Sequence, residues 1–423
     1  MSVTDVTTTV LGDIALILFV STLLGGLARR LGQPAVIGQI LTGVMLGPTL
    51  LGRLPGNPTA RLFPPEVLPY LSVLAQVAIV TFMFVVGYEL NLRSIRASGR
   101  ATLSVAAGAL VVPMILGAGA VQFLPSAFTA VGEHDVGSRS FVLFFAVTVS
   151  ITALPVLAAI IRSTGIAGTR AGVIALAAAG LMDIGAWTAL AVAMPGDAHG
   201  LPVWLTVLLT LALVLGGFLV VRPLLRRWID RPDGLFTSQL PLAIFLATSC
   251  AWATSELGLH AIFGGFLAGL LMPRRDGAPD ADVLRAMEGA TDLLLPLFFV
   301  VTGLSLNIGA LDRNSVLLLC LVLLISVVGK LVPGYLVSRL NGLERRDSAT
   351  VAALLNTRGL TELIALNVGL SAGIIHGRLF TVLALMALIT TAMTSPLLTL
   401  LGRPRHSASA AGEVVPAGSR KET

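Results

Sequence analysis

The sequence carries little charge for its length. Of its 423 residues, 12% are Asp, Glu, Lys or Arg and 55% are hydrophobic, and the mean hydropathy is +0.91. Soluble domains carry about 25% charged residues, so a soluble fold is excluded. Cysteine is also scarce. Cys250 and Cys320 both lie within apolar stretches, which argues against a disulfide framework and against a metal cluster.

The motifs of several protein classes are missing as well. No Gly-x-x-x-x-Gly-Lys-Ser/Thr sequence is present, so we expect no ATP-driven pump in this chain, and no other motif indicates an enzyme or a cofactor. The formal net charge is +6, but the basic residues stand singly or in pairs between apolar blocks. Because they form no basic face, we expect no nucleic-acid partner.

Long apolar blocks dominate the chain instead, and each is of a length that suits a membrane helix. They predict an all-α polytopic protein of about 13 transmembrane helices embedded in the lipid bilayer. The blocks lie near 10–28, 33–50, 67–90, 101–124, 140–161, 168–195, 202–226, 236–256, 259–272, 290–309, 314–340, 348–372 and 377–401.

The basic residues predict how the helices are oriented. Most arginines outside the blocks follow odd-numbered blocks, and cytoplasmic loops are the ones enriched in Lys and Arg. We therefore expect the N-terminus outside and the C-terminus inside a plasma (inner) membrane. Residues 1–403 would form the membrane domain, and 404–423, rich in Ser, Ala and Gly, a short disordered cytoplasmic tail.

An internal repeat connects the two halves of the chain. The residues Phe82, Val85, Gly87, Leu90 and Asn91 recur in the same spacing as Phe298, Val301, Gly303, Leu306 and Asn307, and Ala35, Gly38, Leu41 and Gly43 recur as Ala261, Gly264, Leu267 and Gly269. This pairs a repeat at about 10–195 with one at about 236–401, joined by a connector helix at about 202–226. Such inverted repeats place a binding site at the membrane midplane. Ordinary packing of Gly-rich helices is the alternative explanation.

Four ionisable residues lie near the middle of apolar blocks: Asp183, Lys330, Arg358 and Glu362. A charge at this depth is costly unless it is paired or faces a cavity. Lys330 either pairs with Asp183 or lies in its field. Arg358 and Glu362 can pair if the helix continues between them. A structural salt bridge is the alternative to an ion-binding role for Asp183.

Two blocks carry signs of a broken helix at corresponding positions of the repeats. Pro155 lies mid-block and frees carbonyls near Ile151, and the hydroxyls of Ser150 and Thr152 can offer oxygen ligands to a cation. The equivalent block carries the polar sequence Asn356, Thr357, Arg358 and Gly359, which favours local unwinding. Two interrupted helices at matching positions indicate the ion site of a transporter.

Several segments together resemble the bacterial monovalent cation:proton antiporter superfamily, in particular the sodium or potassium:proton exchangers related to potassium-efflux systems. The resemblance covers about residues 10–400. It rests on Gln33–Leu41 with Leu46–Pro48, on Ile151–Leu157, on the segment around Asp183, on Gly329–Leu331 and on Asn356–Leu363.

The resemblance implies a dimerisation domain and a core domain with two unwound crossing helices. It further implies that Asp183 binds both the cation and the proton, that Thr152 lies near the crossing, and that the core moves like an elevator against a homodimer interface containing the second and ninth blocks. Many relatives carry an acid, Asn or Gln where this chain has Met182. In two-acid relatives, the Lys at the position of Lys330 is thought to pair with that first acid. One carboxylate favours electroneutral exchange, unless Lys330 itself titrates.

The sequence therefore predicts an antiporter that exchanges Na⁺ or K⁺ for H⁺ by alternating access, with no metal bound other than the transported cation. A channel-like potassium-efflux protein and a non-transporting sensor or partner built on the same scaffold are the alternatives. Neither the cation nor the direction of transport follows from the sequence, and export of an organic ion or ionophore stays open.

Overall fold

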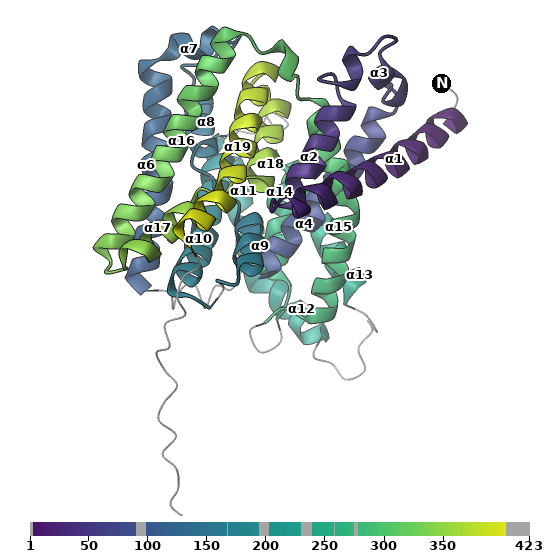
Figure 1. The fold of residues 1–423 in the computed structure, drawn as a ribbon. Helices are drawn as coiled ribbons and strands as arrows, with labels where there is room; N and C mark the ends of the chain where they lie inside the picture. Colours follow the sequence, from purple (N-terminus) through teal and green to yellow (C-terminus); the bar gives the residue numbers. More distant parts are fainter. Residues whose placement is uncertain are drawn as a thin grey trace, which may run out of the picture.

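The computed structural model describes residues 3–89, 99–166, 168–193, 203–229, 239–257, 259–274 and 278–402, and these form a bundle of helices (Figure 1). The first half contains α1 (Val3–Arg30), α2 (Ala35–Leu46), η1 (Leu51–Arg53), α3 (Pro58–Leu62), α4 (Leu68–Glu89), α6 (Gly99–Phe123), α7 (Pro125–Thr129), α8 (Arg139–Thr148), α9 (Leu154–Thr164) and α10 (Arg170–Ala193). The connector contains α11 (Val203–Gly216), the π-helical turn η2 (Gly217–Val221) and α12 (Arg222–Ile229). The second half contains α13 (Leu240–Glu256), α14 (Ala261–Leu271), α15 (Ala281–Leu304), η3 (Ile308–Ala310), α16 (Arg313–Leu340), α17 (Arg345–Leu355), α18 (Leu360–Ser371) and α19 (Gly377–Leu401).

Each apolar block of the sequence corresponds to one helix or to a run of consecutive helices. In the part of the chain that the structure describes, nine helical segments are long and apolar enough to cross a membrane, and α8 and α14 are shorter apolar helices. The prediction of an all-α polytopic membrane protein is confirmed. The number of crossings and the side on which each terminus lies remain predictions, and the expected tail, 404–423, lies outside the described residues.

The start of α15 differs from its apolar block. The helix begins at Ala281, well before position 290, because Asp280 caps it: the Asp280 carboxylate accepts hydrogen bonds from the backbone amides of Asp282 and Val283. Arg285, which the block boundaries put in a loop, therefore lies in the first turns of a helix.

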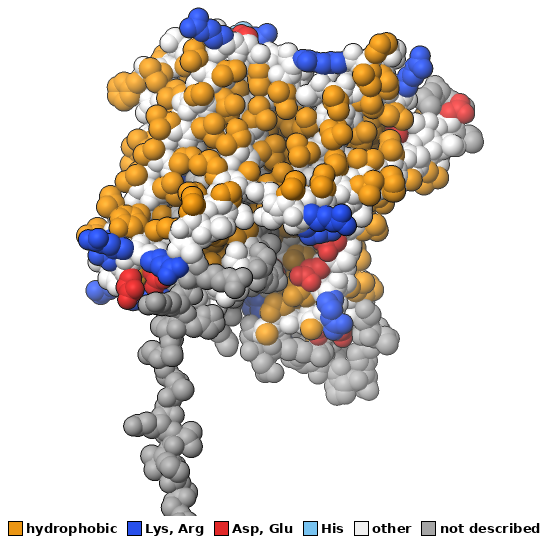
Figure 2. Space-filling model, in the orientation of Figure 1, with side chains coloured by type: hydrophobic (Ala, Val, Ile, Leu, Met, Phe, Trp, Pro, Cys, Tyr) orange, Lys and Arg blue, Asp and Glu red, His pale blue; other side chains and the backbone are white. Residues whose placement is uncertain are grey.

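The surface agrees with a membrane location. Figure 2 shows hydrophobic side chains across the middle of the visible face, with Lys and Arg gathered toward its upper and lower edges. Because apolar side chains in water are destabilising over so wide an area, this face is one that lipid covers.

The helices divide into two groups by their contacts. One group contains α1, α2, α4, α13, α14 and α15, and the other contains α6, α8, α9, α10 and α16 to α19. Figure 1 shows α1, α13 and α15 on one side of the molecule and α6, α16 and α17 on the other. Both broken helices belong to the second group.

Glycine contacts in the first group occur in matching pairs. A Cβ on Gly38 of α2 would overlap the carbonyl of Leu24 in α1, and a Cβ on Gly264 of α14 would overlap the carbonyl of Cys250 in α13. The close approach of two backbones at both places explains why only glycine fits there.

The same pairing holds where the two repeats meet. Gly43 of α2 packs against Gly303 of α15, and Gly269 of α14 packs against Gly87 of α4. These four glycines are among the residues that recur between the two halves of the sequence. Such equivalent contacts support the predicted repeat, since chance matches between Gly-rich helices do not require equivalent partners. The outer boundaries of the repeats remain a prediction.

The predicted homodimer interface receives no support from α14. Within the described helix no residue of α14 is exposed, because α4 and α13 cover it. In α2, Leu41 and Met45 are exposed. The homodimer remains a prediction.

Replacing Gly43 with alanine tests the glycine contacts. The new Cβ would lie 2.7 Å from the carbonyl oxygen of Val300 and 2.8 Å from the Cα of Gly303, both backbone atoms that cannot rotate away. We expect Gly43→Ala to lower the free energy of unfolding by about 1–3 kcal/mol, measured by thermal unfolding of the purified protein in detergent. Gly12→Ala is the matched control because nothing lies within 4 Å of its Cβ position. Equal melting temperatures for the two variants would contradict the packing.

Candidate functional site

Two broken helices cross in the second group of helices. The chain leaves α8 after Thr148, runs without helical structure through Ile151–Ala153, and enters α9 at Leu154. A similar break separates α17 from α18. The two breaks touch, because the backbone amide of Ala153 donates a hydrogen bond to the carbonyl of Thr357 at 3.0 Å.

Pro155 and Gly359 account for the positions of the breaks. Pro155 lies in the first turn of α9, where its missing N–H is not needed. It therefore begins the second half-helix, and the interruption expected near Ile151 lies directly before it. Gly359 has φ +133° immediately before α18, a backbone conformation that is strained for any residue with a side chain. A Cβ at this position would also lie 3.3 Å from Val156.

Arg358 holds the open end of α8. Its side chain is fully buried, one terminal nitrogen, Nη1, donates to the carbonyl of Thr148 at 2.8 Å, and the other, Nη2, donates to the carbonyl of Val149. The last carbonyls of a helix lack partners within the helix and attract positive charge. Arg358 thus satisfies carbonyls that the break would otherwise leave bare.

Arg358 also pairs with Glu362. The Arg358 Nη1 and Glu362 Oε1 atoms are 3.1 Å apart, and both side chains are fully buried. We expected this pair only if one helix continued from Arg358 to Glu362. In the structure α18 begins at Leu360, so the pair forms across the start of the helix. The second carboxylate oxygen of Glu362 has no hydrogen-bond partner among the described residues.

Lys330 contacts the other break residues that the sequence singled out. Its Nζ donates to the hydroxyl of Thr152 at 2.7 Å and to the backbone carbonyl of Ser150. The Thr152 hydroxyl donates onward to the carbonyl of Leu355 at 2.9 Å, and the Ser150 hydroxyl donates to Val147 at 2.7 Å. Donating a proton leaves lone pairs on each hydroxyl oxygen, so the expectation that Ser150 and Thr152 offer oxygen ligands to a cation remains a prediction.

Asp183 lies in α10 with 2% of its surface exposed. Neither of its carboxylate oxygens has a hydrogen-bond partner among the described residues. Its charge and that of Lys330 act on each other, yet no ion pair joins the two side chains. Of the two alternatives for Lys330, direct pairing with Asp183 is therefore not seen, and a role in the field of Asp183 remains a prediction.

The threonines of α19 also contribute to this region, and the sequence analysis missed them. Asn356 donates to the carbonyl of Thr390 at 3.4 Å, and the hydroxyls of Thr357 and Thr394 are 3.4 Å apart. Thr391 lies beside Gly359. The signal was present, since three threonines lie mid-block in the helix that the repeat pairs with α10 and Asp183.

Together these contacts leave one carboxylate available. Arg358 and Lys330 are fixed at the break, and Glu362 is bound by Arg358. Among the described residues, Asp183 is the buried carboxylate with two unsatisfied oxygens, and a buried carboxylate in that state is stable only with a proton or a cation bound. The site offers oxygen atoms only, which suits a hard cation.

Comparisons with known proteins show which family and which relatives this chain resembles. The family pattern "Sodium/hydrogen exchanger, transmembrane" matches residues 15–400. Cation/H⁺ antiporter 18 of Arabidopsis thaliana is 33% identical over 409 residues, which are 95% of this chain and 50% of that protein. The Na⁺/H⁺ antiporter NhaS4 of Synechocystis is 33% identical over 92% of this chain and 96% of its own length. This chain thus spans about half the length of the Arabidopsis relative.

A solved structure has the same fold. The sodium proton antiporter MjNhaP1 of Methanocaldococcus jannaschii aligns with a TM-score of 0.64 over 93% of this chain and 96% of its own, at 14% identity.

Removing Arg358 tests its structural role. Arg358→Met leaves Glu362 buried without its partner and the end of α8 uncapped, so we expect a loss of about 3–5 kcal/mol in the free energy of unfolding. Thermal unfolding in detergent measures it. The double variant Arg358→Met with Glu362→Gln removes the uncompensated charge and should regain part of the loss. If the double variant is no more stable than Arg358→Met, then Arg358 does not stabilise the protein by neutralising Glu362.

Proposed function

The chain belongs to the transmembrane sodium/hydrogen exchanger family, and we propose that it exchanges a monovalent cation, Na⁺ or K⁺, for H⁺ across the plasma membrane. The observation that carries this proposal is the Asp183 carboxylate, which is buried in α10 with both oxygens unsatisfied among the described residues. The names of the relatives, a cation/H⁺ antiporter and a Na⁺/H⁺ antiporter, support the same ions.

Competition at one carboxylate is sufficient for coupling. Asp183 holds either a proton or a cation. Whichever ion binds first neutralises the carboxylate, so no full negative charge is left to attract the second ion. An empty, ionised Asp183 is costly at membrane depth. The loaded forms therefore move more readily than the empty form, and each direction of movement carries one ion.

The remaining site residues hold the crossing in place. Arg358, Lys330 and Thr152 tie α8, α16 and α17 together, and Glu362 balances Arg358. Asn356 contributes a buried side-chain oxygen without a hydrogen-bond partner among the described residues, and we assign it as an additional oxygen ligand for the cation.

The two groups of helices suit alternating access. Close glycine contacts occur within both groups, and buried charges with their hydrogen bonds add to the packing of the crossing group. We propose that the second group moves as a unit against the first and carries Asp183 between the two sides of the membrane.

Asp183→Asn tests the central role of this carboxylate. We expect it to reduce cation-driven proton flux to the background of protein-free liposomes, because an amide binds neither a titrating proton nor a cation with comparable strength. A pH-sensitive dye inside proteoliposomes measures the flux on imposing Na⁺, K⁺ or Li⁺ gradients at several pH values. Asp292→Asn is the matched control, since Asp292 is an exposed aspartate of α15 and its loss should leave the flux unchanged.

Full flux in Asp183→Asn would overturn the proposal. Potassium movement that is not coupled to protons would identify a channel. A lack of flux in the unmodified protein under every gradient would favour a non-transporting membrane protein.

The charge on the site predicts insensitivity to voltage. Two cations and two carboxylates surround the crossing, and Lys330 is fixed by two acceptors, so only Asp183 exchanges its ion. One cation then replaces one proton with no change in net charge. We expect an imposed membrane potential to leave the final proton gradient unchanged in proteoliposomes that hold a fixed cation gradient. A proton gradient that shifts with the imposed potential would show that Lys330 or a second group titrates.

A further inference from the structure

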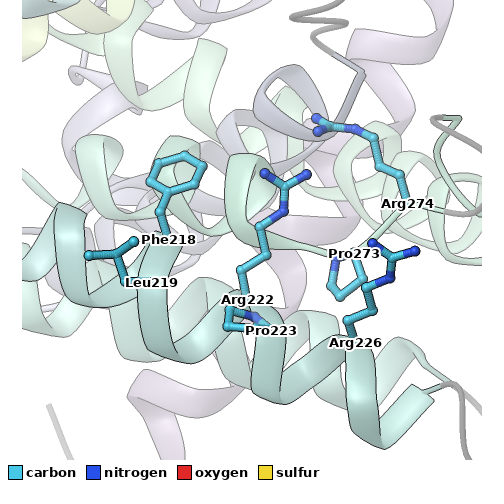
Figure 3. Close-up of a pocket in the computed structure, with 7 residues that line it drawn as sticks. All are labelled: Phe218, Leu219, Arg222, Pro223, Arg226, Pro273 and Arg274. Carbon is cyan, nitrogen blue, oxygen red and sulfur yellow. The ribbon is translucent and has the colours of Figure 1, made fainter.

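A pocket of about 300 Å³ lies away from the crossing, between the connector and the end of α14. Figure 3 shows its lining side chains, with Arg222 and Arg226 on α12 and Arg274 on the facing segment. The full lining set is Phe218, Leu219, Arg222, Pro223, Arg226, Pro273 and Arg274. Neither the repeat nor the ion site involves these residues.

A π-helical turn shapes one wall of the pocket. In η2 the backbone amide of Arg222 donates to the carbonyl of Gly217, one residue further back than in an α-helix. The next residue, Pro223, has no backbone N–H and therefore cannot donate the hydrogen bond that would resume the α-helical pattern. Phe218 and Arg222 thereby reach the same pocket, and the Arg222 guanidinium lies 5.8 Å from the centre of the Phe218 ring.

The opposite wall is rigid. Arg274 donates to the carbonyls of Gly87 and Tyr88 at 3.0 Å, at the end of α4, and lies over the Tyr88 ring. The Tyr88 hydroxyl donates to the carbonyl of Pro273 at 3.1 Å. Burial, followed by the nearby charge of Arg222, lowers the pKa of Arg274 below its usual range. The two guanidinium groups thus lie close enough to repel each other.

Such a concentration of positive charge suits an anion. Three arginines line one small pocket, and Arg222 has no ion-pair partner among the described residues. Guanidinium groups bind phosphate oxygens through paired, charge-assisted hydrogen bonds. A phosphate group is therefore the chemistry that the pocket recognises.

The apolar surroundings identify the source of that phosphate. Leu219 lines the pocket and is 72% exposed, and Val220 and Leu224 beside it are exposed as well. Acyl chains can cover these side chains, whereas a free phosphate leaves them bare. The arginine-rich connector end also lies on the predicted cytoplasmic side, where basic pockets between membrane helices bind anionic headgroups.

We propose that this pocket binds the phosphate group of an anionic membrane phospholipid, whose acyl chains lie along the exposed face of η2 and α12. The lipid would join the connector to the ends of α4 and α14, which Arg274 and Tyr88 already hold together. This binding site is independent of ion exchange at Asp183, so each proposal can fail without the other.

Arg222→Gln tests the site. We expect the full-length protein, purified in detergent, to bind dioleoyl phosphatidylglycerol more tightly than dioleoyl phosphatidylcholine, and the variant to bind phosphatidylglycerol about tenfold more weakly, since one charge-assisted contact is lost. Native mass spectrometry measures the bound lipid, and thermal unfolding in each lipid confirms it. Arg222→Lys keeps the charge but not the paired donors, so its affinity for phosphatidylglycerol should lie between that of the unmodified protein and that of Arg222→Gln.

Arg285→Gln is the matched control, because Arg285 is an exposed arginine of α15 that does not line the pocket. It should bind phosphatidylglycerol as the unmodified protein does. Equal binding of the two lipids, or an equal loss in both glutamine variants, overturns the site. If inorganic phosphate or glycerol phosphate alone gives the full stabilisation, the lipid assignment is overturned and the ligand is a free phosphate.

Discussion

The end of α8 is the constraint from which the rest of the site follows. A helix that stops inside a membrane exposes carbonyls that neither water nor the next turn can satisfy. Here Arg358 and Lys330 satisfy them, through Thr148, Val149 and Ser150. The cost of burying two cations is offset because each donates to fixed acceptors. Both cations are thus held at the break, and no hydrogen bond joins either to Asp183 among the described residues.

That division of charge gives the four ionisable residues unequal roles. Glu362 is bound by Arg358 and serves the fold, whereas Asp183 is bound by nothing that the structure describes. Under the proposed mechanism the other three charges stay constant, and the net charge of the region then depends on what Asp183 holds. A proton and a monovalent cation are equivalent in this respect, and that equivalence is the physical basis for the one-for-one exchange that we propose.

The depth of a charged residue in the membrane was predictable from the sequence, but the side of the helix on which its side chain lies was not. A charge in the middle of an apolar block is at membrane depth whatever its neighbours, so Asp183, Lys330, Arg358 and Glu362 could all be found. The breaks were marked by Pro155 and Gly359, and the repeat by glycines. The contact of Lys330 with Ser150 and Thr152 was not predicted, although both residues were singled out, because the sequence does not show which side chains of different helices face each other. The threonines of α19 were overlooked for a related reason: in a membrane helix a threonine usually bonds to its own preceding turn, as Thr390 and Thr391 also do here.

The two repeats make equivalent contacts where their glycines pack, but they carry different residues at the crossing. Gly43 and Gly269 make corresponding backbone contacts with Gly303 and Gly87, and such contacts depend only on the absence of a side chain, so both copies must keep them. At the crossing, one break carries Ser150 and Thr152 and the other Asn356 and Arg358, while α10 carries an aspartate and α19 threonines. A symmetric site would bury a second carboxylate and would need a second mobile ion to neutralise it. Under the proposed mechanism, this asymmetry would limit the site to one exchangeable charge, and the symmetric packing would preserve the matched interfaces against which the crossing group moves.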